Sequence, residues 1–146
     1  MERGYKFIVV FIISIFLLIS QAHAGEIAVI VNASGPLVNV SEADIADIYL
    51  GEKRFQDGIK IAPLLYPEGI VKEVFLREAV RMTQKEYKLY WTKKIFQAGI
   101  PIPKRSASPA DIVKIVREDK CGIGFLPKEE LKDLSGLKVI MIIGTK

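Results

Sequence analysis

The side chains that could hold a ligand stand where predicted secondary-structure elements begin or end. Backbone N–H groups at helix starts attract anions, and hydroxyl, amide and guanidinium groups add directional hydrogen-bond donors. Such residues occur in three places: after the first apolar run, at the start of one predicted helix, and just before another. The candidate ligand-binding residues are Asn32, Ser34, Gly35, Gly69, Ile70, Val71, Arg105 and Ser106.

Each group of candidates also has a purely structural interpretation. Asn32, Ser34 and Gly35 follow the carboxyl end of a predicted strand, where open α/β sheets bind ligands, but turn residues are equally expected there. Gly69 stands at a corner between a strand and a helix, where glycine serves the turn geometry alone. Arg105 lies in a proline-bounded loop, either as an anion clamp or as a solvated charge. The sequence leaves both interpretations open.

Enzyme chemistry has little support in the sequence. The only histidine, His23, lies in a segment that we expect to be removed, and the only cysteine is Cys121. A mature chain without histidine excludes serine–histidine triads and histidine-ligated zinc, and one cysteine forms no internal disulfide. The sequence also contains neither a phosphate loop nor a nucleophile elbow. We therefore expect no enzymatic activity, no metal and no cofactor.

The N-terminus has the three-part layout of a secretory signal. Basic residues precede an apolar run at 7–19, and small residues follow at 22–24. A membrane anchor is the alternative, but a run of this length makes about 20 Å of helix, and a spanning helix needs about 20 residues. The sequence therefore predicts a signal peptide at 1–24 and a periplasmic domain at 25–146, with no membrane span after cleavage.

The composition is that of one globular domain without a nucleic-acid surface. Half of the 146 residues are hydrophobic, which is enough for one core. The net charge is +4, but lysines and arginines are scattered among acids rather than gathered into a run. This pattern is compatible with a small anionic ligand and gives no support to nucleic-acid binding.

The first half of the chain predicts two strands separated by a helix. The run 27–31 is apolar and rich in β-branched residues, which indicates a strand covered on both faces in a parallel sheet. Ser41 begins a helix that ends near Gly51. An Asp-Gly turn then precedes a strand at 61–65, where Pro63 suggests a sheet edge or a strand start.

The second half predicts three helices and two more strands. The helix that opens after Gly69 should bury Val71, Val74, Phe75 and Met82, and the one capped by Thr83 should bury Tyr87, Trp91, Ile95 and Ala98. A loop is expected at 100–106, followed by a helix capped by Ser108. Strands at 122–126 and 139–143 complete an alternating pattern, which is typical of the α/β class.

Several motifs occur in an order that points to a known family. They are the segment Ile-Ala-Asp-Ile-Tyr-Leu-Gly at 45–51, Asp57-Gly58, Pro67-Glu68-Gly69, Tyr90-Trp91 and Gly122-Ile123-Gly124-Phe125. In this order they resemble the short, exported members of the phosphate ABC transporter solute-binding-protein family. The resemblance implies an α/β fold of the type 2 periplasmic-binding-protein kind. Because full members are about twice as long, it implies a minimal form, with one lobe or one lobe plus a vestigial second.

The family resemblance also implies a function. It suggests binding of a small anion such as phosphate, with an ABC permease or another envelope protein as partner. The family's Gly-Ser-Gly-Thr stretch is matched by residues 67–71, where Ile70 replaces a hydroxyl and Glu68 adds a negative charge. A carboxylate there opposes anion binding by about 1 kcal/mol. The alternative is therefore an accessory or protein-interaction module that has lost the anion site.

The signal peptide gives the first testable prediction. Protein recovered from the periplasm should begin at Gly25, because Ala22 and Ala24 are the small residues at the expected cleavage positions. Intact mass spectrometry measures this directly. A periplasmic form that retains residues 7–19 would instead establish an anchored protein.

Overall fold

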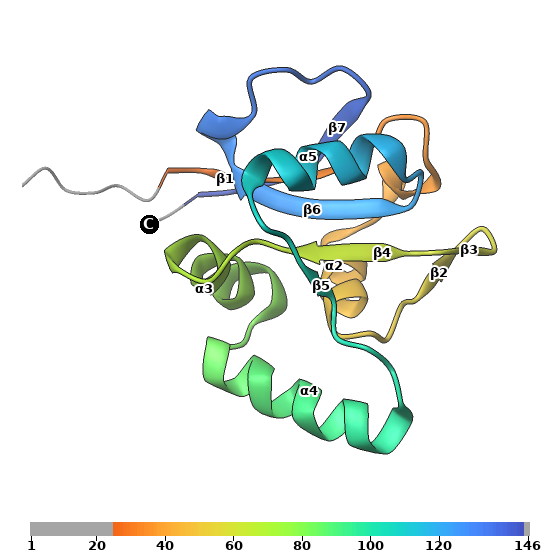
Figure 1. Ribbon diagram of the computed structural model, residues 1–146, viewed down its shortest axis with the longest axis vertical. Coiled ribbons are helices and arrows are strands. Elements are labelled where there is room, and N and C mark those ends of the chain that lie inside the picture. The colour runs from red at the N-terminus through yellow and green to blue at the C-terminus, as the bar shows by residue number, and fades with distance from the viewer. Residues whose placement is uncertain (1–24, 145–146) are drawn as a thin grey trace, which may run out of the picture.

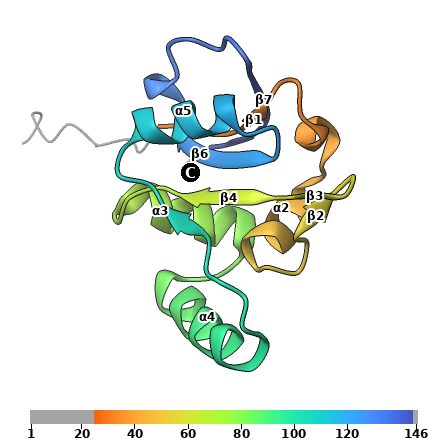
Figure 2. The ribbon, with the colours of Figure 1, turned by 45° about the vertical axis from the view of Figure 1, so that its right-hand side comes forward.

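The structure is a computed structural model that describes residues 25–144 (Figures 1 and 2). The predicted signal peptide at 1–24 lies outside this range and stays a prediction. Within the described range, no helix combines the length and the apolar character needed to cross a membrane.

A five-stranded sheet in the order β5-β4-β6-β1-β7 forms the centre of the fold. Its strands are β1 (Ile27–Asn32), β4 (Ala62–Leu65), β5 (Lys104–Arg105), β6 (Gly122–Pro127) and β7 (Leu137–Ile143). Strand β4 is parallel to β5 and β6, whereas β1 is antiparallel to β6 and β7. The predicted parallel setting of β1 is therefore wrong. A continuous apolar run reports that both faces are buried, and it carries no information on strand direction.

Helices cover both faces of the sheet. Alternate residues of β1 enter two cores, with Val29 in the larger core and Ile30 in the smaller one. The larger core lies under α2 (Glu42–Tyr49) and α3 (Ile70–Phe75), and the smaller one lies under α5 (Pro109–Glu118). Figures 1 and 2 show α5 on one side of the sheet and α2 and α3 on the other. The predicted burial of β1 on both faces is confirmed.

Three predicted helix starts are confirmed by their capping hydrogen bonds. At each start, a hydroxyl oxygen accepts a bond of 3.1 Å from the N–H group three residues later. The pairs are Ser41 with Asp44, Thr83 with Glu86 at the start of α4 (Gln84–Ala98), and Ser108 with Asp111. In the first two pairs, the acidic side chain also accepts a bond from the N–H group of the capping residue.

Two helices differ from the predicted patterns. The helix after Gly69 continues through a π-helical turn, η2 (Leu76–Val80), and ends at Arg81, whose φ is 65°. Met82 therefore lies beyond the helix, although it packs partly buried against the core. The buried face of α4 is confirmed at Tyr87 and Trp91, which are 2% and 1% exposed.

The prediction is wrong for the second half of α4, where Ile95 and Ala98 are exposed. Figure 1 shows α4 at the margin of the molecule, where only the face with Tyr87 and Trp91 is buried. The apolar residues of α4 therefore keep their helical spacing beyond the part of the helix that packs on the core.

The predicted Asp-Gly turn is confirmed in a small hairpin of β2 (Phe55–Gln56) and β3 (Ile59–Lys60). Asp57 and Gly58 both have positive φ, as such a turn requires. Pro63 is the second residue of β4, which agrees with its predicted place near a strand start. The predicted loop at 100–106 contains the two-residue β5. The short 3₁₀ helices η1 (Pro36–Asn39) and η3 (Lys128–Glu130) complete the fold.

The larger core yields a prediction about stability. The ring of Phe75 stacks on Phe125 with centroids 3.7 Å apart and meets Tyr49 edge-on at 4.8 Å. We expect Phe75→Ala to lower the free energy of unfolding by about 3–5 kcal/mol, and Val74→Asp or Phe75→Asp to unfold the domain. Chemical denaturation followed by circular dichroism measures this.

The control for this prediction is Ile70→Ala in the same helix, because Ile70 is 56% exposed. Its effect should stay within about 0.5 kcal/mol. Cooperative unfolding of Phe75→Asp at the parent's midpoint would contradict the assigned helix face.

Candidate functional site

The direction of the strands defines the edge of the sheet that is suited to ligand binding. Strands β4, β5 and β6 run parallel, so their carboxyl ends meet at one edge. The turn at 66–69 follows β4 there and leads into α3, and Ser106 follows β5 and precedes α5. Because β1 is antiparallel to β6, it begins at this edge and ends at the opposite one. Ligands of open α/β sheets bind outside the carboxyl ends of parallel strands.

The sheet therefore separates the candidate residues into two groups. The group at the carboxyl edge of β4 and β5 comprises Gly69, Ile70, Val71, Arg105 and Ser106. The group at the opposite edge comprises Asn32, Ser34 and Gly35. The sequence could not separate them, because the two groups differ only in the direction of the strand that they follow.

The group after β1 has a structural role. Asn32 is 6% exposed, and its Nδ2 donates to the carbonyl oxygens of Val116 and Arg117 at 3.0 and 2.9 Å. Its Oδ1 accepts a bond of 2.9 Å from the N–H group of Ser34. Asn32 thus satisfies carbonyl groups in the last turn of α5. These contacts favour the structural interpretation of this loop.

Gly35 is fixed by close packing in the same loop. A Cβ atom at this position would lie 1.8 Å from the carbonyl oxygen of Lys120. A larger residue would therefore force the loop away from the end of α5. The close contact between residue 35 and the Lys120 carbonyl group therefore requires glycine at this position, whether or not a ligand binds.

The group at the carboxyl edge surrounds the carboxylate of Glu68. Its Oε1 lies 2.6 Å from Nζ of Lys72 and 3.2 Å from Nη2 of Arg105. The hydrogen bond from Lys72, with weaker attraction from Lys72 and Arg105, holds the pKa of Glu68 below its usual value. Lys72 is almost buried, at 9% exposure, whereas Arg105 is exposed. The two cations therefore share a carboxylate of the chain itself.

Ser106 is the most unusual polar residue at this edge. It is 2% exposed, and its N–H group donates to the carbonyl oxygen of Leu65 at 2.9 Å. Its Oγ has no hydrogen-bond partner among residues 25–144. Buried hydroxyl groups are normally paired, so Ser106 holds an unused donor and acceptor next to Arg105.

The backbone conformation at position 69 explains why a glycine occupies it. Its φ of 141° is a conformation that residues with a side chain rarely adopt, and it precedes α3 without a side-chain cap. Ile70 follows it and is exposed, and Val71 is half-buried against the larger core. These positions thus leave the start of α3 open toward the carboxyl edge, without a hydroxyl group of their own.

Sequence reasoning missed three residues at this edge. Lys72 could have been found, because it stands four residues after Glu68 on a predicted helix. Tyr66 and Glu130 could not, because their hydrogen bond of 3.3 Å joins residues 64 positions apart. Burial and the nearby carboxylate of Glu130 raise the pKa of Tyr66.

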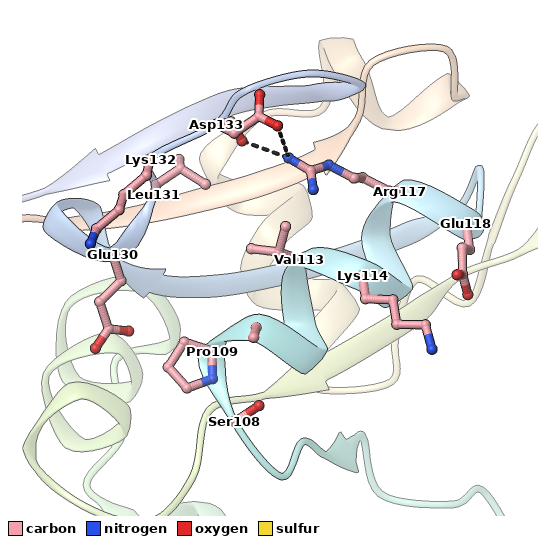
Figure 3. A pocket seen from close by; sticks show the side chains of 11 residues that line it. Ser108, Pro109, Val113, Lys114, Arg117, Glu118, Glu130, Leu131, Lys132 and Asp133 are labelled. Atoms are coloured by element: carbon pink, nitrogen blue, oxygen red, sulfur yellow. Dashed lines mark hydrogen bonds and ion pairs between the residues drawn. The ribbon is translucent and has the colours of Figure 1, made fainter.

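A separate hollow of about 660 Å³ lies between α5 and residues 130–133 (Figure 3). Arg117 reaches from α5 to Asp133. Its Nη2 lies 2.7 Å from the carbonyl oxygen of Asp133 and 3.3 Å from the Asp133 carboxylate. The charged residues that line the hollow are Lys114, Arg117, Lys132, Glu118, Glu130 and Asp133. Because bases and acids balance, this hollow has no preference for either sign of charge.

Comparison with known proteins identifies the fold. No protein-family model and no curated protein matches the sequence. The chain is similar to a solved Clostridium perfringens protein described as a phosphate ABC transporter substrate-binding protein with bound phosphate, at TM-score 0.61 and 16% identity. It is also similar to an ABC-type phosphate transport receptor from Vibrio cholerae, at TM-score 0.59 and 15% identity.

The matches cover 82% of this chain, but only 46% and 47% of the two solved chains. The chain thus spans about half the length of these proteins. The predicted α/β fold class is confirmed, and the described residues share the fold of phosphate-type substrate-binding proteins over about half the length of those proteins. Sequence identities of this size establish the fold alone.

The structural role of Asn32 gives a prediction. Asn32→Ala should lower the free energy of unfolding by about 1–3 kcal/mol, because it leaves carbonyl groups at the end of α5 without donors. Ser34→Ala is the matched control, since the bond at Ser34 uses its backbone N–H group. Thermal unfolding of both variants measures the difference. Equal stability of Asn32→Ala and the parent would contradict the capping role.

Proposed function

We propose that the chain is a minimal solute-binding-like protein of the periplasm that binds a small oxyanion such as phosphate for an ABC-type importer. The observation that carries this proposal is the fold, which aligns with about half of a protein that has phosphate bound. Both solved relatives are described as transport proteins, which supports a binding role over an enzymatic one.

The carboxyl edge of the sheet supports an anion site in particular. Lys72 and Arg105 direct their cationic groups toward one oxygen of Glu68, which is an arrangement that also suits an oxygen of phosphate. Ser106 adds a hydroxyl group that is not used by the described part of the chain. Gly69 leaves the adjoining backbone unobstructed, because nothing lies within 4 Å of a Cβ built there.

Glu68 limits the affinity of this site. Its carboxylate occupies the contacts with Lys72 and Arg105 that an oxyanion would need. An incoming phosphate must displace this internal anion and tolerate its negative charge nearby. Oxyanion binding should therefore be weak in the parent protein.

The same observation favours a second candidate function. If Glu68 holds Lys72 and Arg105 permanently, the edge has no free cation pair for a ligand. The protein would then be an accessory or protein-interaction module of the envelope that retains the fold and has lost the anion site. Exposed Ile70 at the position where the family has a hydroxyl group agrees with this alternative.

A double variant tests whether the carboxyl edge can hold an oxyanion. Glu68→Gly with Ile70→Ser removes the competing carboxylate and supplies a hydroxyl group, so phosphate affinity should rise roughly tenfold to a thousandfold. Isothermal titration calorimetry with inorganic phosphate measures this. The single variant Glu68→Gln, which keeps the side-chain shape, should produce part of the gain.

The control is Glu78→Gln, which makes the same change in net charge at an acid that pairs with Arg77 instead. It should leave phosphate affinity unchanged. If the double variant binds phosphate no better than the parent, the carboxyl edge is not an anion site, and the accessory module becomes the better description.

A further inference from the structure

A groove of about 510 Å³ lies beside β4, away from the carboxyl edge of the sheet. Strand β5 pairs with β4 only at Leu64 and Leu65. The segment 100–103 comes before this pairing and diverges from β4, which leaves Ala62 and Pro63 to line the groove. The volume falls within the range of about 300–1,000 Å³ that is common for small-molecule sites.

The floor of the groove is apolar and belongs to the core. Its deepest residues are each no more than 4% exposed, and they come from α2, α4, β4 and the residue before β4. These floor residues are Ile48, Ile61, Leu64 and Trp91. Ile100 and Ile102 extend the apolar surface along the wall, and Ile102 is 44% exposed. Because the floor residues are almost fully buried, the wall supplies most of the apolar surface that a ligand could contact.

The lining of the groove is strongly basic. Four cationic side chains contribute to it, against the single acid Asp119, and they are Lys53, Arg54, Lys60 and Lys104. Lys53 is neutralised by Asp44 at 3.1 Å. Within residues 25–144, the other three make no ion pair within 4.0 Å, and all three are exposed.

The groove therefore combines an apolar floor with an uncompensated positive rim. The hollow beside α5 is larger, but its bases and acids balance. Charge complementarity selects a negatively charged ligand for the groove, and the apolar floor selects one with a hydrocarbon body. A bare oxyanion has no group to cover the floor, and an apolar cation would be repelled by the rim.

We propose that this groove binds an amphiphilic organic anion. Its hydrocarbon body lies against Ile102 and over the floor at Ile61 and Trp91. Its carboxylate lies at the rim among Arg54, Lys60 and Lys104. The site is independent of the proposed oxyanion site, because none of Lys72, Arg105 and Ser106 lines the groove.

The experiment uses Trp91, the only tryptophan of the chain, as an internal reporter. The mature protein is titrated with decanoate below its aggregation concentration, and tryptophan fluorescence is recorded. We expect a saturable change that weakens as salt is raised. Decyltrimethylammonium has an alkyl chain of similar length with a head group of opposite charge, and it should bind at least roughly tenfold more weakly. The absence of a saturable change with decanoate, or equal binding of the cation, would overturn the proposal.

Charge-reversal variants locate the head group. Lys60→Glu with Lys104→Glu should weaken decanoate binding by roughly tenfold or more. Lys85→Glu with Lys88→Glu makes the same change in net charge on exposed positions outside the groove, and should change the affinity less than twofold. If both pairs of variants weakened decanoate binding equally, the net charge of the protein would explain the loss. That result would overturn the assignment of Lys60 and Lys104 to the binding site.

A second pair of variants tests the apolar contact. Ile102→Asp places a charge on the wall and should abolish binding, whereas Leu89→Asp, at a residue that is 54% exposed and lies outside the groove, should not. Competition with phosphate tests whether the two sites are separate. Excess phosphate should not displace decanoate beyond the effect of chloride at equal ionic strength. Displacement by phosphate would show that both ligands bind at one site, and would overturn the proposed independence of the groove. Saturation by an acidic, apolar peptide without any binding of decanoate would overturn the choice of occupant.

Discussion

The buried ring and backbone of Tyr49 join the main layers of the molecule. Its Oη donates to the carbonyl oxygen of Leu64 in β4 at 2.9 Å, which ties the end of α2 to the sheet. Its own carbonyl oxygen accepts bonds from Tyr87 Oη at 2.8 Å and Trp91 Nε1 at 3.2 Å. A single fully buried residue thus connects the sheet to α4. Because Trp91 also lines the groove, its bond to the Tyr49 carbonyl oxygen fixes one part of the groove floor.

The antiparallel direction of β1 is the second constraint, because it decides which residues can act together. Reversing β1 relative to β6 places Asn32 at the amino edge of β6, where its amide satisfies the end of α5. The carboxyl edge is left to the turns that follow β4 and β5. A ligand site at the carboxyl edge would therefore be built from the turn at 66–69 and Ser106, without the loop after β1.

Local signals in the sequence were sufficient for the elements and insufficient for the sites. The Ser41 and Thr83 caps, the Asp-Gly turn and the buried run of β1 depend on residues within a few positions of each other, so the sequence displays them. The direction of β1, the bond from Tyr66 to Glu130 and the groove wall depend on segments that meet only after folding. The sequence could therefore suggest candidate residues in turns. It could not predict which of these residues lie at the same edge of the sheet.

The distribution of ion pairs explains why the two proposed sites differ in character. At the carboxyl edge, the single carboxylate of Glu68 offsets one of the two positive charges of Lys72 and Arg105, which reduces their field at a distance. At the groove, Lys60 and Lys104 have no acidic partner among the described residues, and their field extends into solvent over roughly a Debye length. We therefore expect the groove to attract an anion in solution more strongly than the sheet edge does. The proposed oxyanion site lies at one end of β4, and the proposed groove site, with lysines that are unpaired within the described chain, lies along the side of the same strand.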